Sequence, residues 1–145
     1  MNFDFQTQLK IRKAPAEVFD AVVDPKKLAG YFVKDSSGPL ATGATVQWSF
    51  AEAPEPFDVV VDEVVKNQRI VFRWPTTGKE LTRVEMVFKP LEGGHTMVQI
   101  SETGWPQTAA GQKQSYDNAG GWMHMMLCLK GYLEYGINLR AGGAF

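Results

Sequence analysis

Few reactive side chains in this sequence lie in surroundings that would favour catalysis or binding. Glu102 follows Val98 and Ile100 at every second position, so in a strand it would share their inward face. A carboxylate at the end of an apolar face suits acid–base work, whereas a half-solvated strand-end carboxylate would have no such role. Tyr116 and Asn118, near the start of a later helix, are the groups that could help Glu102 move or steady a proton.

The other reactive residues do not form a recognisable catalytic or metal-binding pattern. His95 follows the turn "EGG", and His124 lies about 200° from Trp122 on a helical wheel, which predicts solvent exposure for both. Cys128 lies about 120° from Trp122 and is predicted to be a semi-buried structural thiol rather than a nucleophile. The sequence has no phosphate-binding loop, dinucleotide fingerprint or nucleophile elbow. We therefore expect no metal and no cofactor.

Length, charge and apolar patterning set limits on the class of protein. The 145 residues fit one domain, predicted to span 1–145, and the formal net charge of −1 disfavours nucleic acid. No apolar run reaches the roughly 18 residues needed to cross a bilayer, so membrane insertion is not expected. The N-terminus "MNFDFQTQLK" lacks the pattern of a signal peptide, and with one cysteine the chain is predicted to be cytoplasmic.

The elements that would position Glu102 follow from periodicity and from Gly and Pro breakers. Alternation predicts a first strand over 3–11, and "APAEVFDAVVDPKKLAGYF" predicts two short helices separated at Asp24-Pro25. Five more strands are predicted in the middle of the chain, over 45–50, 57–65, 69–74, 81–89 and 96–102. A long helix ending near Gly136 closes the chain. The pattern predicts an α+β fold in which a curved six-stranded antiparallel sheet wraps around the long C-terminal helix.

Four separated segments carry a resemblance to a known superfamily. They are "IRKAPAEVFDAVVDPKKLAGYF", "RIVFRWP", "ISETGWP" and "GGWMHMMLCLKGYLEYG", in that order. Together they resemble the START-like, birch-pollen-allergen-like superfamily, in the branch named for the heat-shock-chaperone ATPase activator. The resemblance covers essentially the whole chain and implies a helix-grip fold with an internal cavity. Its implications for function are broad, because that superfamily includes lipid carriers, hormone receptors, aromatase/cyclase-like enzymes and co-chaperone domains.

The predicted cavity lies between the sheet and the long helix. The helical wheel turns one apolar stripe inward, and strand alternation turns further apolar sets toward it; ordinary core packing is the alternative for all of them. Asn118 and Ser115 extend the helical stripe, either as inward polar groups or as N-caps. Gly120 and Gly121 suggest a first turn or a close backbone approach. The candidate lining residues are Trp48, Phe72, Trp74, Met86, Phe88, Ile100, Glu102, Trp105, Asn118, Trp122, Met125, Met126 and Leu129.

Three functions are compatible with these residues. The first is binding of a small hydrophobic or amphipathic molecule in the cavity. The second is a cyclase- or isomerase-like reaction that uses Glu102 in the same cavity. The third is a protein-interaction module that contacts a chaperone, although the chain is about the size of one such domain and leaves no sequence for a second chaperone-binding module. Met123 and Leu127 form an outward apolar pair, so the chain is expected to be a monomer or a weak homodimer.

Overall fold

The structure is a computed structural model that describes residues 2–143. Its elements, in chain order, are β1 (Phe5–Ile11), α1 (Pro15–Val23), α2 (Pro25–Leu28), β2 (Asp35–Ser36), β3 (Thr45–Phe50), β4 (Ala53–Val65), β5 (Arg69–Pro75), β6 (Leu81–Leu91), η1 (Glu92–Gly94), β7 (His95–Thr103) and α3 (Ala109–Tyr135). The predicted domain 1–145 extends to Met1, Ala144 and Phe145, which lie outside the described residues.

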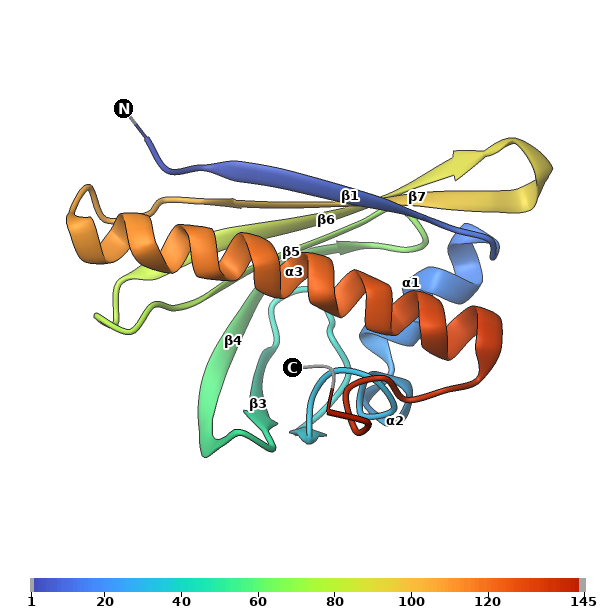
Figure 1. Cartoon of the computed structure of the whole chain (residues 1–145), viewed down its shortest axis with the longest axis horizontal. Helices are drawn as coiled ribbons and strands as arrows, with labels where there is room; N and C mark the ends of the chain where they lie inside the picture. Colours follow the sequence, from blue (N-terminus) through green and yellow to red (C-terminus); the bar gives the residue numbers. More distant parts are fainter. Residues whose placement is uncertain (1, 144–145) are drawn as a thin grey trace.

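One antiparallel sheet runs through the molecule, and α3 crosses it (Figure 1). The strand order is β1-β7-β6-β5-β4-β3-β2, which makes seven strands rather than the predicted six. The additional strand is β2, which pairs with β3 through Asp35 and Ser36, in the segment between the two predicted short helices and the predicted strand over 45–50. Two residues are too few to show an alternation, so this strand had no sequence signal.

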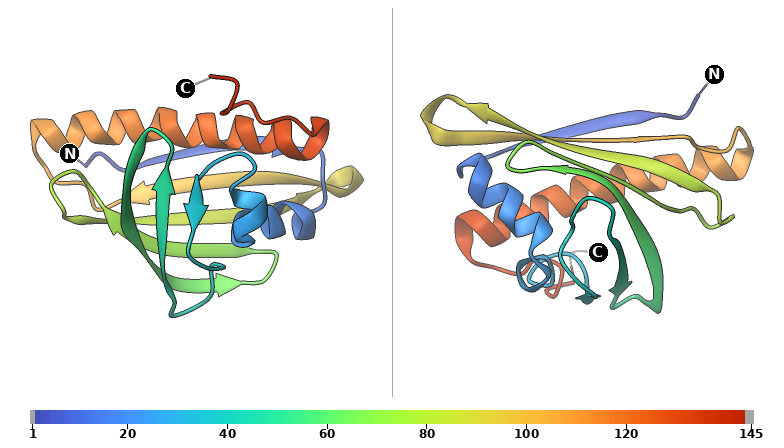
Figure 2. Two further views of the ribbon diagram at one scale, coloured as in Figure 1. Left: turned by 90° about the horizontal axis from the view of Figure 1, so that it is seen from below. Right: turned by 180° about the vertical axis from the view of Figure 1, so that it is seen from behind.

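The curvature of the sheet comes from irregular pairing in its second half. The register shifts between Trp48 and Phe50 where β3 pairs with β4, and between Val61 and Glu63 where β4 pairs with β5. Such shifts bend a strand and increase its twist. The β3–β4 hairpin therefore bends out of the plane of the other strands (Figure 2, right).

The long helix begins earlier than the sequence suggested. Thr108 is the N-cap, and its Oγ1 accepts a hydrogen bond from Gly111 N at 3.0 Å. Capping by Ser115 or Asn118 is therefore wrong, because six residues of α3 precede Ser115 and nine precede Asn118. Ser115 Oγ instead donates to the carbonyl oxygen of Phe3. The helix ends where Gly136 adopts a left-handed conformation with φ of 66°.

The predicted inward stripe of α3 packs against the sheet. Trp122, Met125, Met126 and Leu129 are all buried in one cluster with residues of every strand from β3 to β7. Cys128 is also buried, and His124 is half-buried with a ring nitrogen 3.8 Å from Cys128 Sγ. The expected exposure of His124 was therefore wrong.

The side of α3 that carries Cys128 is covered by segments outside the sheet. The ring of Tyr31, which follows α2, lies 5.5 Å from that of Tyr132. The tail after α3 folds back so closely that a Cβ on Gly131 would lie 3.0 Å from Leu139 Cδ1. The helical wheel predicted burial only for the side of α3 that faces the sheet, so it could not predict burial of the side that these segments cover.

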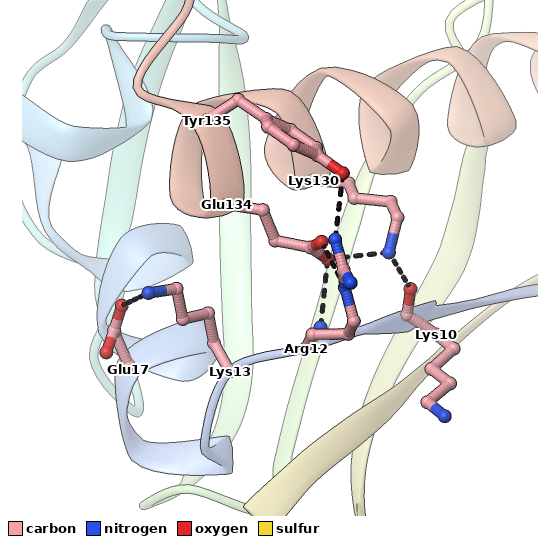
Figure 3. A network of polar contacts seen from close by, with 7 residues as sticks. All are labelled: Lys10, Arg12, Lys13, Glu17, Lys130, Glu134 and Tyr135. Atoms are coloured by element: carbon pink, nitrogen blue, oxygen red, sulfur yellow. Dashed lines mark hydrogen bonds and ion pairs between the residues drawn. The ribbon is translucent and has the colours of Figure 1, made fainter.

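The last turns of α3 are fixed to β1 by an ionic network (Figure 3). Glu134 accepts from the Arg12 backbone N–H at 2.9 Å, from Arg12 Nε at 2.7 Å and from Lys130 Nζ at 2.6 Å. Lys130 also donates to the carbonyl oxygen of Lys10, and Arg12 donates to the hydroxyl of Tyr135. Burial alone would raise the pKa of Glu134, but these donors outweigh it and lower the pKa to about 2.

Within residues 2–143, no helix is both long enough and apolar enough to cross a membrane.

Candidate binding pocket

A pocket opens where the β3–β4 hairpin, the end of β5, α3 and the tail after α3 meet. Its volume is about 240 Å³, and its opening faces solvent. Its walls are mainly apolar, with one amide and one ion pair among them. The lining residues are Phe32, Phe50, Glu52, Ala53, Trp74, Asn118, Gly121, Trp122 and Arg140.

Aromatic rings form most of the pocket wall. Trp74 and Trp122 stack with their centroids 5.1 Å apart and an interplanar angle of 29°. Phe32 lies 5.8 Å from Trp122 and 5.1 Å from Phe50. Stacked indoles offer a flat, polarizable surface, which favours a planar apolar partner over a branched polar one.

Behind this wall lies Glu102, whose side chain is fully buried. Its Oε2 accepts from Trp74 Nε1 at 2.8 Å and from Thr82 Oγ1 at 2.6 Å, and its Oε1 accepts from Trp122 Nε1 at 2.8 Å. The Asn118 amide donates Nδ2 toward both oxygens, at 3.2 and 3.4 Å. One carboxylate therefore holds four side chains, three of which line the pocket.

Local sequence patterns explain how these groups meet. Alternation along β7 turns Glu102 inward after Val98 and Ile100, as predicted. Trp74 and Thr82 are register partners on β5 and β6, so their side chains share one face. Asn118 and Trp122 are four residues apart and therefore lie on the same side of α3. Three neighbouring strands and the helix thus direct polar atoms to one point.

The hydrogen-bond chemistry fits an ionised carboxylate at Glu102. An indole N–H can only donate, so Trp74 and Trp122 both need an acceptor. Each Glu102 oxygen receives two or three donors, which fills its lone-pair directions. The carboxylate also lies behind the lining residues rather than among them. Its observed role is to fix the orientation of the pocket wall.

A charged pair stands at the opening of the pocket. Arg140, in the tail after α3, forms an ion pair with Glu52 of the β3–β4 turn, with Nη2 2.8 Å from Oε1. The guanidinium carbon lies 5.1 Å from the ring centroid of Phe50 and 5.6 Å from that of Phe32. A neighbouring hollow of about 560 Å³ shares Phe32, Glu52 and Arg140 with the pocket. The ion pair therefore lies between two adjacent recesses.

The predicted lining residues separate into three groups. Trp74, Asn118 and Trp122 line the pocket, and Glu102 lies directly behind them. Trp105 instead stacks on Phe5 near β1, with centroids 6.2 Å apart, because the first strand covers it. The remaining candidates are packed in the core: Trp48, Phe72, Met86, Phe88, Ile100, Met125, Met126 and Leu129. A ligand role for any of these residues stays a prediction.

Sequence reasoning missed Phe32, Phe50, Glu52, Ala53 and Arg140 as pocket residues. Phe32, Glu52, Ala53 and Arg140 lie in or beside turns and the tail, where no periodicity indicates which way a side chain points. Phe50 ends the predicted strand over 45–50, two residues after Trp48, so strand alternation could have indicated it. Gly121, a glycine inside an amphipathic helix, was the one further sequence feature that could have indicated a pocket residue. The expected first turn was wrong, because twelve residues of α3 precede Gly121. A Cβ on Gly121 would meet no protein atom within 4 Å, so packing within the protein does not require a glycine there.

Other groups with reactive side chains do not join this site. Tyr116, one of the two residues predicted to assist Glu102, is 65% exposed and accepts a hydrogen bond from Gln112 Nε2 at 3.0 Å. Burial raises the pKa of the Cys128 thiol, which opposes thiolate formation. Within the described part of the chain, no group of three or more His, Cys, Asp and Glu side chains could hold a metal ion.

Comparisons with known proteins find similarity over most of the chain. The family model described as activator of Hsp90 ATPase homolog 1-like protein matches residues 13–134. A solved protein from Staphylococcus saprophyticus is 29% identical, with a TM-score of 0.79 over 93% of this chain and 94% of that one. No curated protein matches the chain.

Two further solved structures, both less than 25% identical, bear on the fold alone. DynU16, a protein in the dynemicin biosynthetic locus, is 24% identical with a TM-score of 0.82, over 94% of this chain and 49% of that one. The Aha1 dimer from Colwellia psychrerythraea is 20% identical with a TM-score of 0.77, over 92% of this chain and 97% of that one.

Proposed function

Because the chain belongs to the family of activator of Hsp90 ATPase homolog 1-like proteins, we propose that it binds a small hydrophobic or amphipathic molecule in the pocket between the sheet and α3. The observation that carries this proposal is the stacked pair of Trp74 and Trp122, open to a pocket of about 240 Å³. Covering the apolar surface that lines the pocket with a ligand is favourable, at about 25 cal/mol for each Å² of apolar area removed from water.

The pocket wall is organised before any ligand arrives. Trp74 and Trp122 are both fixed through their indole N–H groups by Glu102. Their rings therefore need not be ordered when a ligand binds, and the entropy cost of binding is lower than for freely rotating side chains. A gap left by imperfect packing would not have walls fixed by hydrogen bonds, so this preorganisation supports a binding site.

The same geometry favours binding over acid–base catalysis by Glu102. A general base must come within hydrogen-bond reach of the proton that it removes. The oxygens of Glu102 are already occupied by donors from four side chains, and Trp74, Asn118 and Trp122 stand between it and the pocket. A cyclase- or isomerase-like reaction would first require one of these bonds to open.

Two adjacent glycines allow a matched test of binding. Gly121 lines the pocket, whereas Gly120 is exposed on the next position of the same helix, and a Cβ on either would meet nothing within 4 Å. Gly121→Leu should fill the pocket, and Gly120→Leu should leave it open. Both variants remove a helical glycine, so both should gain about 1 kcal/mol of helix propensity.

The measurement is native mass spectrometry of freshly purified protein, followed by NMR titration with the uncharged aromatic probe naphthamide. We expect a retained small molecule or saturable naphthamide binding in the wild type and in Gly120→Leu. Gly121→Leu should weaken naphthamide binding at least tenfold. Equal binding by the two leucine variants would place the probe elsewhere and would refute the proposed site.

Contact with a chaperone is a second candidate, supported by the family to which the chain belongs. The outer face of the sheet carries charged side chains, but many pair with each other, as Arg73 does with Asp62 at 2.9 Å. Of the predicted outward apolar pair, Leu127 is exposed and Met123 packs at the margin of the core. Stimulation of a chaperone ATPase by the purified protein would support this candidate, and its absence at saturating protein would exclude activation.

A further inference from the structure

The two side chains of the ion pair at the pocket opening differ in their exposure to solvent. The side chain of Arg140 is only 14% exposed and lies over Phe32 and Phe50. The side chain of Glu52 is 39% exposed and sits in the turn between β3 and β4. The rings therefore keep the guanidinium in place whether or not Glu52 accompanies it. The carboxylate is the part of the pair that can leave into solvent.

Arg140 faces the pocket in which a ligand would lie. It lines both the aromatic pocket and the neighbouring hollow, and Lys34 adds a second cationic side chain to that hollow. Guanidinium binds a carboxylate through two parallel N–H···O bonds, a geometry that any planar carboxylate can reproduce. A ligand with such a group could replace Glu52 on Arg140 without leaving the cation unpaired.

The aromatic wall sets the other half of the ligand. Trp74 and Trp122 present stacked rings, and the volume of about 240 Å³ is below the roughly 300–1,000 Å³ typical of drug-sized ligands. The body of the ligand should therefore be flat and limited to one or two rings. A cation is disfavoured, because the buried carboxylate of Glu102 is already saturated by donors and because the neighbouring hollow is lined by two cationic side chains, Arg140 and Lys34, against the single carboxylate of Glu52.

We propose that the ligand is a small planar aromatic carboxylate, whose ring lies against Trp74 and Trp122 and whose carboxylate takes the place of Glu52 on Arg140. This inference rests on the proposed binding function and adds the chemical class of the ligand. Glu52 acts in it as an internal competitor that occupies Arg140 while the pocket is empty.

The test compares naphthoate with naphthamide, which have nearly the same shape and differ in charge. In the wild type, NMR titration should give naphthoate a dissociation constant about tenfold lower than that of naphthamide. Arg140→Met keeps an unbranched stem over the two phenylalanine rings and should reduce the preference for naphthoate over naphthamide to about onefold. Glu52→Gln removes the competitor and should increase the preference for naphthoate over naphthamide about threefold above that of the wild type.

The outcomes separate the two proposals. If both probes bind equally well to the wild type and Gly121→Leu weakens both, the pocket is real and the carboxylate inference is wrong. Retention of the naphthoate preference in Arg140→Met would also overturn it, because the anion would then be recognised by another group. If neither probe binds and no small molecule is retained on purification, the proposed function and the inference both fail.

Discussion

The two ends of the contact between α3 and the sheet each contain a glutamate removed from solvent, and the two are satisfied in opposite ways. Glu102 lies beneath the first half of the helix and accepts only uncharged donors, from indole, hydroxyl and amide groups. Glu134 lies in the last turns and accepts from the cations Arg12 and Lys130 (Figure 3).

The difference shows what each carboxylate does for the fold. A cation must keep part of its own hydration, and Arg12 is 54% exposed, so the network of Glu134 lies at the surface and works as an anchor. Neutral donors can be buried completely, which places Glu102 inside the protein. Hydrogen bonds from four side chains offset the cost of burying its charge, and these bonds also fix the orientation of the four side chains.

The largest expected effect is the loss of stability in Glu102→Gln. Glutamine keeps the volume, but whichever way its amide turns, the NH₂ group meets Trp74 or Trp122, which can only donate. We expect a loss of about 3 kcal/mol in the free energy of unfolding, measured by urea denaturation. The indole N–H signals of both tryptophans should also shift in NMR spectra.

Glu85→Gln is the matched control for that substitution. Glu85 belongs to β6 and pairs with Arg69 at 3.4 Å on the outer face of the sheet. Loss of this partly exposed pair should cost less than about 1 kcal/mol. Equal losses in the two variants would mean that Glu102 is no more important than a surface charge, and the contrast between the two ends would disappear.

The second effect concerns the ionic end of the helix. In Glu134→Gln, Lys130 and Arg12 lose their shared carboxylate while both keep access to water. We expect a loss of about 2 kcal/mol in the free energy of unfolding, smaller than at Glu102 because the abandoned cations can be rehydrated. A larger loss than in Glu102→Gln would reverse the proposed order of the two sites.

The pH dependence of stability should separate the two carboxylates further. The pKa of Glu134 is about 2 in the folded protein against an ordinary value of 4.5, so its contribution is complete above 4.5 and is lost as pH falls toward 2. Wild-type protein should therefore lose stability over this window, as measured by urea unfolding at a series of pH values. Glu134→Gln should have a flatter profile there, and an unchanged slope would contradict the role given to Glu134.

The sequence predicted one half of this comparison better than the other. Alternation in β7 placed Glu102 inward, and the helical wheel placed Asn118 and Trp122 on the face that meets it. Their convergence on one carboxylate depends on register between strands, which a single sequence does not contain. The contact of Arg140 with Glu52 joins a tail to a turn across 88 positions of the chain, and neither segment has a periodicity that could predict it.

The smallest expected effect compares one glycine from each half of α3. Gly120→Ala, near the pocket, should stabilise the protein by about 1 kcal/mol, because alanine favours the helix and its Cβ meets nothing within 4 Å. Gly131→Ala, near Glu134, should gain less than half of this, because its Cβ would lie 3.0 Å from Leu139 Cδ1 and the tail must shift. Thermal unfolding of both variants measures the difference. If Gly120→Ala is more stable and still binds naphthamide, neither stability nor binding explains why glycine occurs at this position. Equal gains in stability at both positions would show that the tail does not pack tightly against the last turns of α3.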